Sequence, residues 1–165
     1  MPIPQNTTIS TLAEGAYFTD SFSTMVHYQN QSALDLYLAM AGHIPSWINW
    51  LMSARNKIVA KLGLKNLGHL NDIDFNKPSD RYQLGDQIGI FTIHTNSSHE
   101  VILEDRDKHL NVKVSFYLEP KGEQAIVHAS TVVHVHNMLG KIYMFFVIPV
   151  HKIIVPVTLK KLSPA

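Results

Sequence analysis

The 165-residue sequence contains no cysteine, and charged residues make up only 16% of it. The absence of cysteine excludes disulfides, thiol nucleophiles and zinc–thiolate sites. Lysine and arginine number 14 against 13 aspartates and glutamates, which gives a net charge of +1. This balance gives no electrostatic reason to expect nucleic acid or an acidic surface as a partner.

The motifs of several common enzyme classes are also absent. There is no G-x-G-x-x-G, G-x-S-x-G, P-loop or H-E-x-x-H sequence, and no cofactor is expected. The first residues, MPIPQNTTISTL, lack a basic region followed by an apolar run, so we expect no signal peptide and a cytoplasmic protein. The length predicts one domain over residues 1–165, in which residues 1–16 form an extended arm.

The most informative stretch runs from Asn137 to Leu162 and is apolar on most of its circumference. It predicts one long helix that starts at Asn137 or in the preceding turn and bends near Pro149. We expect this helix to be largely covered, because a helix apolar all round is buried or lies in a membrane. Its longest uninterrupted apolar run, Ile142 to Val150, is nine residues, well short of the roughly 20 that a span needs. His151 and Lys152 follow directly, so no transmembrane span is expected, and association of this stretch with a membrane surface is left as the alternative.

Two helices and several strands are predicted before this stretch. Residues 17–28 alternate as a strand with Phe18, Phe22 and Val26 on one face, an alternation that Asp20 breaks. A first helix should begin at Ser32, capped with the help of Asp35, and a second at Pro45, with apolar residues at helical spacing as far as Leu62.

Residues 65–86 are predicted to be mostly loop, and strands are predicted from there to residue 136. Ile88 to Thr95, Glu100 to Asp105, Leu110 to Glu119 and Gln124 to His136 are joined by short polar segments, which favours an antiparallel meander. A curved, half-polar sheet needs a cover on its apolar face, and the last helix is available for it. We therefore predict an α+β, helix-grip fold, with the sheet wrapped around the long C-terminal helix and a pocket between them.

Several stretches resemble the bacterial domain-of-unknown-function family 2867, over about residues 17 to 162. The most specific is the block HN-x-LGK-x-Y, from His136 to Tyr143, followed by P-x-H at Pro149 to His151. The resemblance implies a fold of the START-like, birch-pollen-allergen-like helix-grip group and no established activity. Some relatives are fused to a nucleotide-binding oxidoreductase domain, so such a domain is one partner that the resemblance suggests.

Twelve residues are predicted to contact a small apolar ligand between the sheet and the last helix. They are Trp47, Leu51, Arg55, Phe91, Glu100, Phe116, His136, Asn137, Tyr143, Phe146, Val150 and His151. Arg55 lies among apolar residues, and a buried arginine demands a carboxylate, so we expect it to pair with Glu100 or Asp107. The alternative is that Arg55 anchors an acidic group of the ligand.

Histidines offer two further hypotheses. His151 is either a structural group beside the backbone that Pro149 disrupts or a catalytic acid or base. His128, His134 and His136 share one face of a strand, where imidazoles could hold a metal, although no carboxylate stands at ligand spacing.

The sequence thus leaves three functions open. The first is binding of a small apolar molecule. The second is an enzyme of the cyclase, dehydratase or isomerase kind, with a pocket histidine as base. The third is an interaction module that meets an oxidoreductase partner or forms a homodimer, which a filled core and an exposed apolar patch would favour.

Overall fold

A computed structural model describes residues 1–61, 63, 66, 68, 70 and 72–163. Six strands form one antiparallel sheet in the order β1-β6-β5-β4-β3-β2, so the first strand closes onto the last. The elements follow one another as α1 (Thr8–Thr11), β1 (Phe18–His27), α2 (Ala33–Ala41), α3 (Ser46–Ala60), η1 (Ser79–Arg81), β2 (Gln87–Ile88), β3 (Phe91–Asn96), β4 (Glu100–Arg106), β5 (Leu110–Lys121), β6 (Gln124–Val135), α4 (Met138–Leu159) and η2 (Lys160–Leu162).

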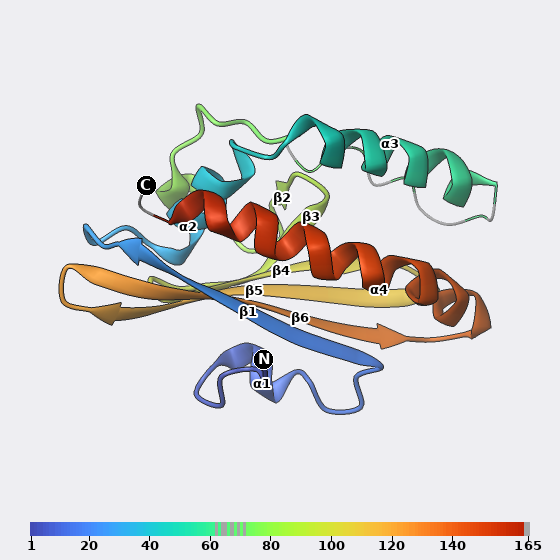
Figure 1. The fold of residues 1–165 in the computed structure, drawn as a ribbon, viewed down its shortest axis with the longest axis horizontal. Helices are drawn as coiled ribbons and strands as arrows, with labels where there is room; N and C mark the ends of the chain where they lie inside the picture. Colours follow the sequence, from blue (N-terminus) through green and yellow to red (C-terminus); the bar gives the residue numbers. More distant parts are fainter. Residues whose placement is uncertain (62, 64–65, 67, 69, 71, 164–165) are drawn as a thin grey trace.

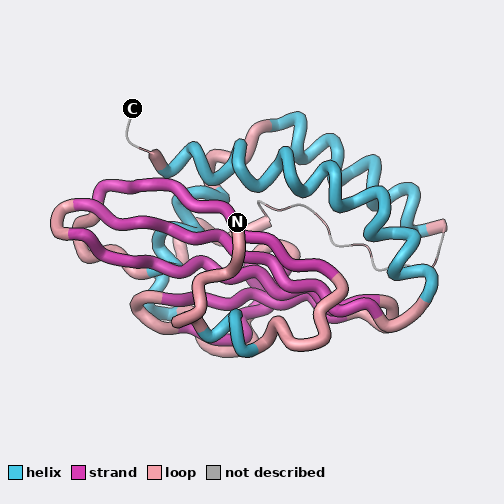
Figure 2. Tube along the Cα trace, turned by 60° about the horizontal axis from the view of Figure 1, so that its bottom comes forward, coloured by secondary structure: helices cyan, strands magenta, loops and turns pink. Residues whose placement is uncertain are grey.

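The sheet separates two layers, as Figure 1 shows. The helices α3 and α4 lie on one side of it, which we call the inner face, and α1 lies on the other, the outer face. Figure 2 shows α3 and α4 side by side over the strands. This order and arrangement confirm the predicted α+β helix-grip fold.

Local signals explain where the helices begin. Ser32 caps α2 and forms a reciprocal capping box with Asp35. Asn137 caps α4 by accepting a hydrogen bond from the Gly140 amide at 3.1 Å. Pro45 is the N-cap residue of α3 rather than its first residue, and Leu62, predicted to close the apolar stripe of that helix, lies outside the described residues.

Two predicted elements differ from the structure. The strand expected over Ile88–Thr95 is divided, because Gly89 adopts a positive φ of 60° and starts a turn between β2 and β3. A side chain on Gly89 would meet the Leu70 carbonyl oxygen at 2.8 Å. The extended arm over residues 1–16 is also wrong, because this segment contains α1 and fully buries Ile9 against Ile102 and Val132 on the outer face.

The long helix is less covered than its composition predicts. Of α4, only Gly140, Met144, Thr158 and Leu159 are buried. The helix runs from Met138 to Leu159 with both prolines inside it. By length and composition alone, the helical stretch Met138–Leu162 could cross a membrane, and only 17% of its most apolar window is buried. The sequence analysis rejected a span and did not anticipate this result.

Candidate functional site

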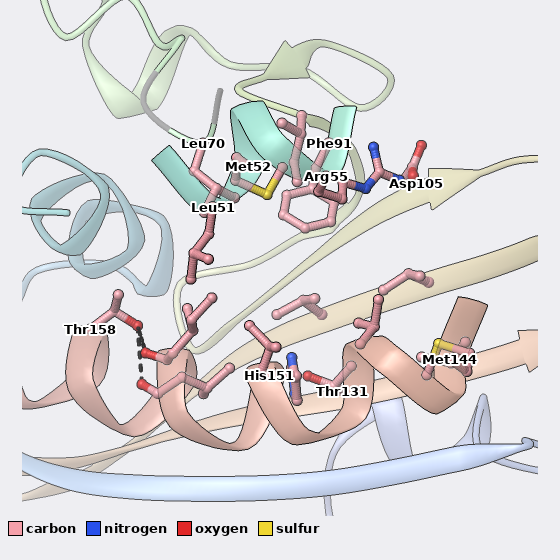
Figure 3. Close-up of a pocket in the computed structure, with 18 of the residues that line it drawn as sticks. Leu51, Met52, Arg55, Leu70, Phe91, Asp105, Thr131, Met144, His151 and Thr158 are labelled. Carbon is pink, nitrogen blue, oxygen red and sulfur yellow. Dashed lines mark hydrogen bonds between the residues drawn. The ribbon is translucent and has the colours of Figure 1, made fainter. Parts of the chain in front are cut away.

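A cavity of about 660 Å³ lies between the inner face of the sheet and the helices α3 and α4. The alternation of β5 supplies its floor, since Leu110, Val112, Val114 and Phe116 all point inward. From α3, Leu51 and Met52 face it, and Figure 3 shows these side chains across the space from α4. The volume falls in the range of small-molecule sites, roughly 300–1,000 Å³.

Eight of the twelve predicted ligand contacts line this cavity. The eight come from α3, α4 and the sheet, as the fold prediction requires: Leu51, Arg55, Phe91, Phe116, Tyr143, Phe146, Val150 and His151.

Polar side chains in the cavity wall are few and fall into two groups. The first lies near the start of α4, where Arg55 Nε donates to the Tyr143 hydroxyl at 2.9 Å and the guanidinium stands 5.2 Å from the centre of the tyrosine ring. In Figure 3, Arg55 and Asp105 point toward one another. This group ties α3 to α4 across one end of the cavity.

The second polar group joins α4 to the sheet. His151 Nε2 lies 3.2 Å from each carboxylate oxygen of Asp20, and its ring meets Phe18 edge-on at 5.8 Å. Asp20 is paired across the strands with Thr131, which also faces the cavity. The carboxylate that interrupts the apolar face of β1 therefore belongs to the site. His151 contacts this carboxylate and not, as one hypothesis held, the backbone near Pro149.

One buried tyrosine also lines the cavity. Burial, with a smaller contribution from Tyr82, raises the pKa of Tyr37 above its usual value. Its ring packs edge-on against Phe116 at 5.3 Å. Tyr37 therefore stays neutral at physiological pH and offers the site a hydroxyl and an aromatic wall.

Two predicted contacts instead form the joint at the start of α4. Asn137, the cap of that helix, also bonds His109, with 2.9 Å between Asn137 Nδ2 and His109 Nδ1, and neither Asn137 nor His136 lines the cavity. Gly140 packs so closely that an added Cβ would lie 2.4 Å from the His109 carbonyl oxygen. The block from His136 to Tyr143 is thus mainly a docking joint, and its last residue reaches the site.

The other two predicted contacts lie elsewhere. Trp47 on α3 is exposed and not part of the lining. Glu100 is on the outer face, where its carboxylate accepts hydrogen bonds from the amides of Thr8 and Ile9 at 2.7 and 3.1 Å. The expected Arg55–Glu100 pair is therefore wrong, because the sheet separates the two side chains.

The histidines of β6 do not face the cavity either. His134 Nε2 lies 2.9 Å from the Glu14 carbonyl oxygen on the outer face, and His128 lies 3.5 Å from Glu119. His136 follows the end of β6 and is exposed. In the described part of the chain, no group of three or more histidine or acidic side chains could hold a metal ion.

Sequence reasoning missed several lining residues. Thr131 and Asp105 are polar groups on inward positions of strands that line it, and Asp20 lies behind them as the partner of His151. The break that Asp20 makes in the apolar face of β1 was the one visible signal. Thr158 is buried and donates to the carbonyl oxygens of Ile154 and Val155, both at 3.0 Å. The sequence did not reveal these residues as part of the site, because their positions depend on the pairing of distant strands and on how α4 packs on the sheet.

The cavity opens between the two covering helices. Ile58 on α3 and Ile142, Phe146 and Val150 on α4 line the cavity, yet their exposed fractions are 62%, 49%, 67% and 40%. Side chains that are both lining and exposed mark a mouth, so we call these four residues the mouth of the cavity. Its rim is apolar on both helices.

Comparisons with known proteins place this geometry in a family. A solution structure of a major latex protein family member from Arabidopsis thaliana matches with 14% identity and a TM-score of 0.30, over 86% of this chain and 94% of that one. No curated protein matches. The family model described as "Protein of unknown function (DUF2867)" matches residues 12–158, which include all six strands and the whole cavity wall. The chain belongs to the DUF2867 family.

Proposed function

We propose that this protein binds a small, mainly apolar molecule in the cavity between the sheet and α4. The observation that carries the proposal is the cavity itself, about 660 Å³ lined almost entirely by aliphatic and aromatic side chains. Empty apolar volume of this size lowers stability, since a core normally fills its space. A bound apolar molecule recovers that packing.

The two polar groups suggest what else the ligand carries. Arg55 with Tyr143 stands at one end, and His151 with Asp20 and Thr131 stands on the wall formed by β1, β6 and α4. A small number of polar groups in an apolar site fixes the orientation of a ligand. We infer a ligand with an apolar body and one or two hydrogen-bonding groups.

The first test is native mass spectrometry of the untagged protein as purified, before and after denaturation. A discrete extra mass that is lost on denaturation supports the proposal and gives the class of the molecule. A protein that is bare as purified is tested next with 1-anilinonaphthalene-8-sulfonate, and one bound probe per chain is the supporting stoichiometry. Failure to retain any molecule in both experiments would contradict the proposal.

Two neighbouring isoleucines provide a matched pair of variants. Ile154 lines the cavity, whereas Ile153 is exposed and does not. Ile154→Trp should fill the cavity and weaken binding by about tenfold or more, equivalent to roughly 1.4 kcal/mol. Ile153→Trp adds the same side chain one residue away and should leave binding unchanged. Equal losses in both variants would place the ligand outside the cavity.

The His151–Asp20 contact supports a second candidate function, catalysis with His151 as general base. A carboxylate that holds an imidazole in one orientation is a recurrent arrangement in acid–base sites. His151→Gln and Asp20→Asn should then abolish conversion of the co-purified molecule, followed by its chromatographic retention and its mass, while both variants still bind the probe. If both variants convert it as fast as the wild type, the catalytic function is excluded.

The third function, an interaction module, was tied to a filled core with an exposed apolar patch. The patch exists, since Phe145 and Ile153 are largely exposed, but the core beneath α4 holds the cavity. Ligand binding is therefore the better-supported function, and the patch needs its own explanation.

A further inference from the structure

Ligand binding leaves the solvent-facing side of α3 and α4 unexplained. Among the described residues, 14 large hydrophobic side chains are exposed, and nine belong to these two helices. We call these nine the helical face: Trp47, Trp50, Ile58, Met138, Ile142, Phe145, Phe146, Val150 and Ile153. Exposed large hydrophobic side chains gathered on two neighbouring helices favour an interaction site.

The helix α4 has the composition of a helix that water does not surround. It is apolar on most of its circumference, and helices that are apolar all round are either buried in a core or in contact with a membrane. Here only one side is docked on the sheet, and Phe145 and Ile153 on the other side are 73% and 60% exposed. Two tryptophans of α3 extend the same face, and this residue type concentrates at membrane–water boundaries.

The charges of the two helices identify the kind of surface that fits them. With η2, they carry Arg55, Lys57, Lys141, Lys152, Lys160 and Lys161. The sequence has no aspartate or glutamate between Asp35 and Asp72, and none after Glu123. The overall charge of +1 therefore conceals that all charged side chains of these three helices are cationic, and all of them except Arg55, which lines the cavity, are lysines. A cationic and apolar face complements an anionic lipid surface.

The mouth of the cavity lies within this face. Ile58, Ile142, Phe146 and Val150 belong both to the mouth and to the helical face. A surface that covered the helical face would also cover the mouth. An apolar ligand could then pass between a bilayer and the cavity without crossing water, which a mouth on any other side would not permit.

We propose that α3 and α4 dock this protein on an anionic lipid membrane, with the mouth of the cavity against the bilayer. The docking itself is independent of the ligand, and only the passage of a ligand through the mouth rests on the proposed function. The helix α4 lies on the surface and does not span it, because one side stays attached to the sheet through Gly140, the His151–Asp20 contact and Leu159.

The cations disfavour a second copy of the chain as the occupant. A two-fold contact through the helical face would place each lysine-bearing α4 against its equivalent. Every charged side chain that α3, α4 and η2 carry has the same sign, and like charges brought together oppose association. An anionic membrane meets no such opposition.

Vesicle co-sedimentation tests the docking. The untagged protein should sediment with phosphatidylcholine vesicles that contain about 30 mol% phosphatidylglycerol, and much less with pure phosphatidylcholine. Binding should weaken as sodium chloride rises from about 0.05 to 0.5 M, because salt screens the lysines. Equal binding to both vesicles at all salt concentrations, or binding to neither, would overturn the proposal.

Matched double variants locate the contact. Phe145→Ser with Ile153→Ser removes one aromatic and one aliphatic residue of the helical face, neither of which lines the cavity. The control, Tyr17→Ser with Met25→Ser, removes an exposed aromatic residue just before β1 and an exposed apolar residue within it, and neither belongs to the helices. The first pair should lower vesicle affinity by about tenfold, and the second should leave it unchanged. Equal effects would overturn the assignment of the face.

Charge reversal provides an independent readout. Lys152→Glu with Lys160→Glu should abolish the preference for phosphatidylglycerol. The control, Arg106→Glu with Lys121→Glu, makes the same change in net charge on the strands and should preserve most of that preference. Resistance of the bound protein to extraction by alkaline carbonate would overturn surface docking in favour of a span. A dimer that forms through the helical face and excludes vesicles would also overturn it.

The docking and the proposed function can fail separately. Ile154→Trp should still bind vesicles, because the altered side chain is inside the cavity. The Phe145→Ser, Ile153→Ser variant should still bind 1-anilinonaphthalene-8-sulfonate with one probe per chain. If filling the cavity abolished vesicle binding while the protein stayed folded, docking would depend on the ligand site and the proposal as stated would be wrong.

Discussion

The two faces of one sheet are covered in different ways, and the difference separates stability from binding. On the outer face, the short N-terminal segment packs Ile9, Ile102 and Val132 with no exposed surface. On the inner face, two longer helices cover the strands and leave a cavity of about 660 Å³. The short N-terminal segment is thus tightly packed on the outer face, whereas α3 and α4 enclose a cavity on the inner face.

Two carboxylates, one on each face, also differ in their hydrogen bonding. The Glu100 carboxylate on the outer face accepts hydrogen bonds from two amides of α1 and from the Ser115 hydroxyl at 2.8 Å, so its bonding is internal and complete. On the inner face, His151 and Asp20 meet at the wall of the cavity, where one Asp20 oxygen, Oδ2, has no hydrogen-bond donor although His151 is nearby. The complete network on the outer face stabilises the fold, whereas the Asp20 carboxylate keeps one buried acceptor without a donor behind the cavity wall.

The largest effect should come from breaking the outer network. Glu100→Ala leaves the Thr8 and Ile9 amides and the Ser115 hydroxyl without their acceptor, which should lower the free energy of unfolding by about 3–5 kcal/mol. Urea denaturation measures it, with the exposed Glu123→Ala in the β5–β6 turn as the control. A loss below about 1 kcal/mol would mean that water replaces these bonds and that the N-terminal segment is only loosely attached.

A matched pair of isoleucines compares the packing of the two faces directly. Ile102 is fully buried on the outer face, whereas Ile154 borders the cavity. Ile102→Ala should cost about 3–4 kcal/mol because a new void opens in a filled core, and Ile154→Ala about 1 kcal/mol because space already exists beside it. Chemical denaturation of both variants tests this, and equal losses would show that the inner face is as tightly packed as the outer one.

One contact on the inner face should be nearly as intolerant as the outer face. Gly140→Ala gains helix propensity of about 1 kcal/mol but places Cβ 2.4 Å from the His109 carbonyl oxygen, so the net loss should be about 2 kcal/mol. Lys141→Ala is the control, because it changes the neighbouring exposed position of the same helix. Gly122 in the β5–β6 turn is unsuitable as a control, because its φ of +70° would strain any side chain placed there. Stabilisation by Gly140→Ala would show that the joint between α4 and the β4–β5 turn can yield.

The sequence predicted what local patterns determine. The alternation of β5 directed Leu110, Val112, Val114 and Phe116 to one face, and all four line the cavity. Ser32 was recognisable as a helix cap, and Asn137 as a possible helix start, because capping depends on residues within one turn. The element order followed from these signals, and with it the pocket between α4 and the sheet.

Contacts between distant segments could not be predicted in the same way. Nothing near Glu100 in sequence indicates that α1, more than 90 residues away, supplies its hydrogen-bond donors. Asp20 stood out as a break in an apolar strand, but its partner His151 is 131 residues away. The exposed side of α4 was missed because its composition was taken to require a protein cover, whereas a lipid surface also satisfies that composition.

The smallest predicted effect concerns acid stability on the outer face. Burial raises the pKa of Glu104, but hydrogen bonds from Asn111 and Lys113 and the charges of Lys113 and Arg106 lower it more, so it lies below the ordinary 4.5. The unfolded chain therefore binds this proton more readily than the folded one. The stability that Glu104 contributes is fully present above about pH 4.5 and is lost as pH falls through the lower, folded-state pKa.

Glu104→Gln removes this dependence without changing the shape of the side chain. At pH 6 and low ionic strength, the variant should be about 1 kcal/mol less stable than the wild type, and the difference should shrink toward pH 3 as the wild-type carboxylate takes up its proton. Asp35, Asp86 and Glu119 also have lowered pKa values and contribute to acid unfolding in both proteins, so only the difference reports Glu104. A difference that stayed constant with pH would mean that Glu104 stabilises the outer face through hydrogen bonds that glutamine also forms.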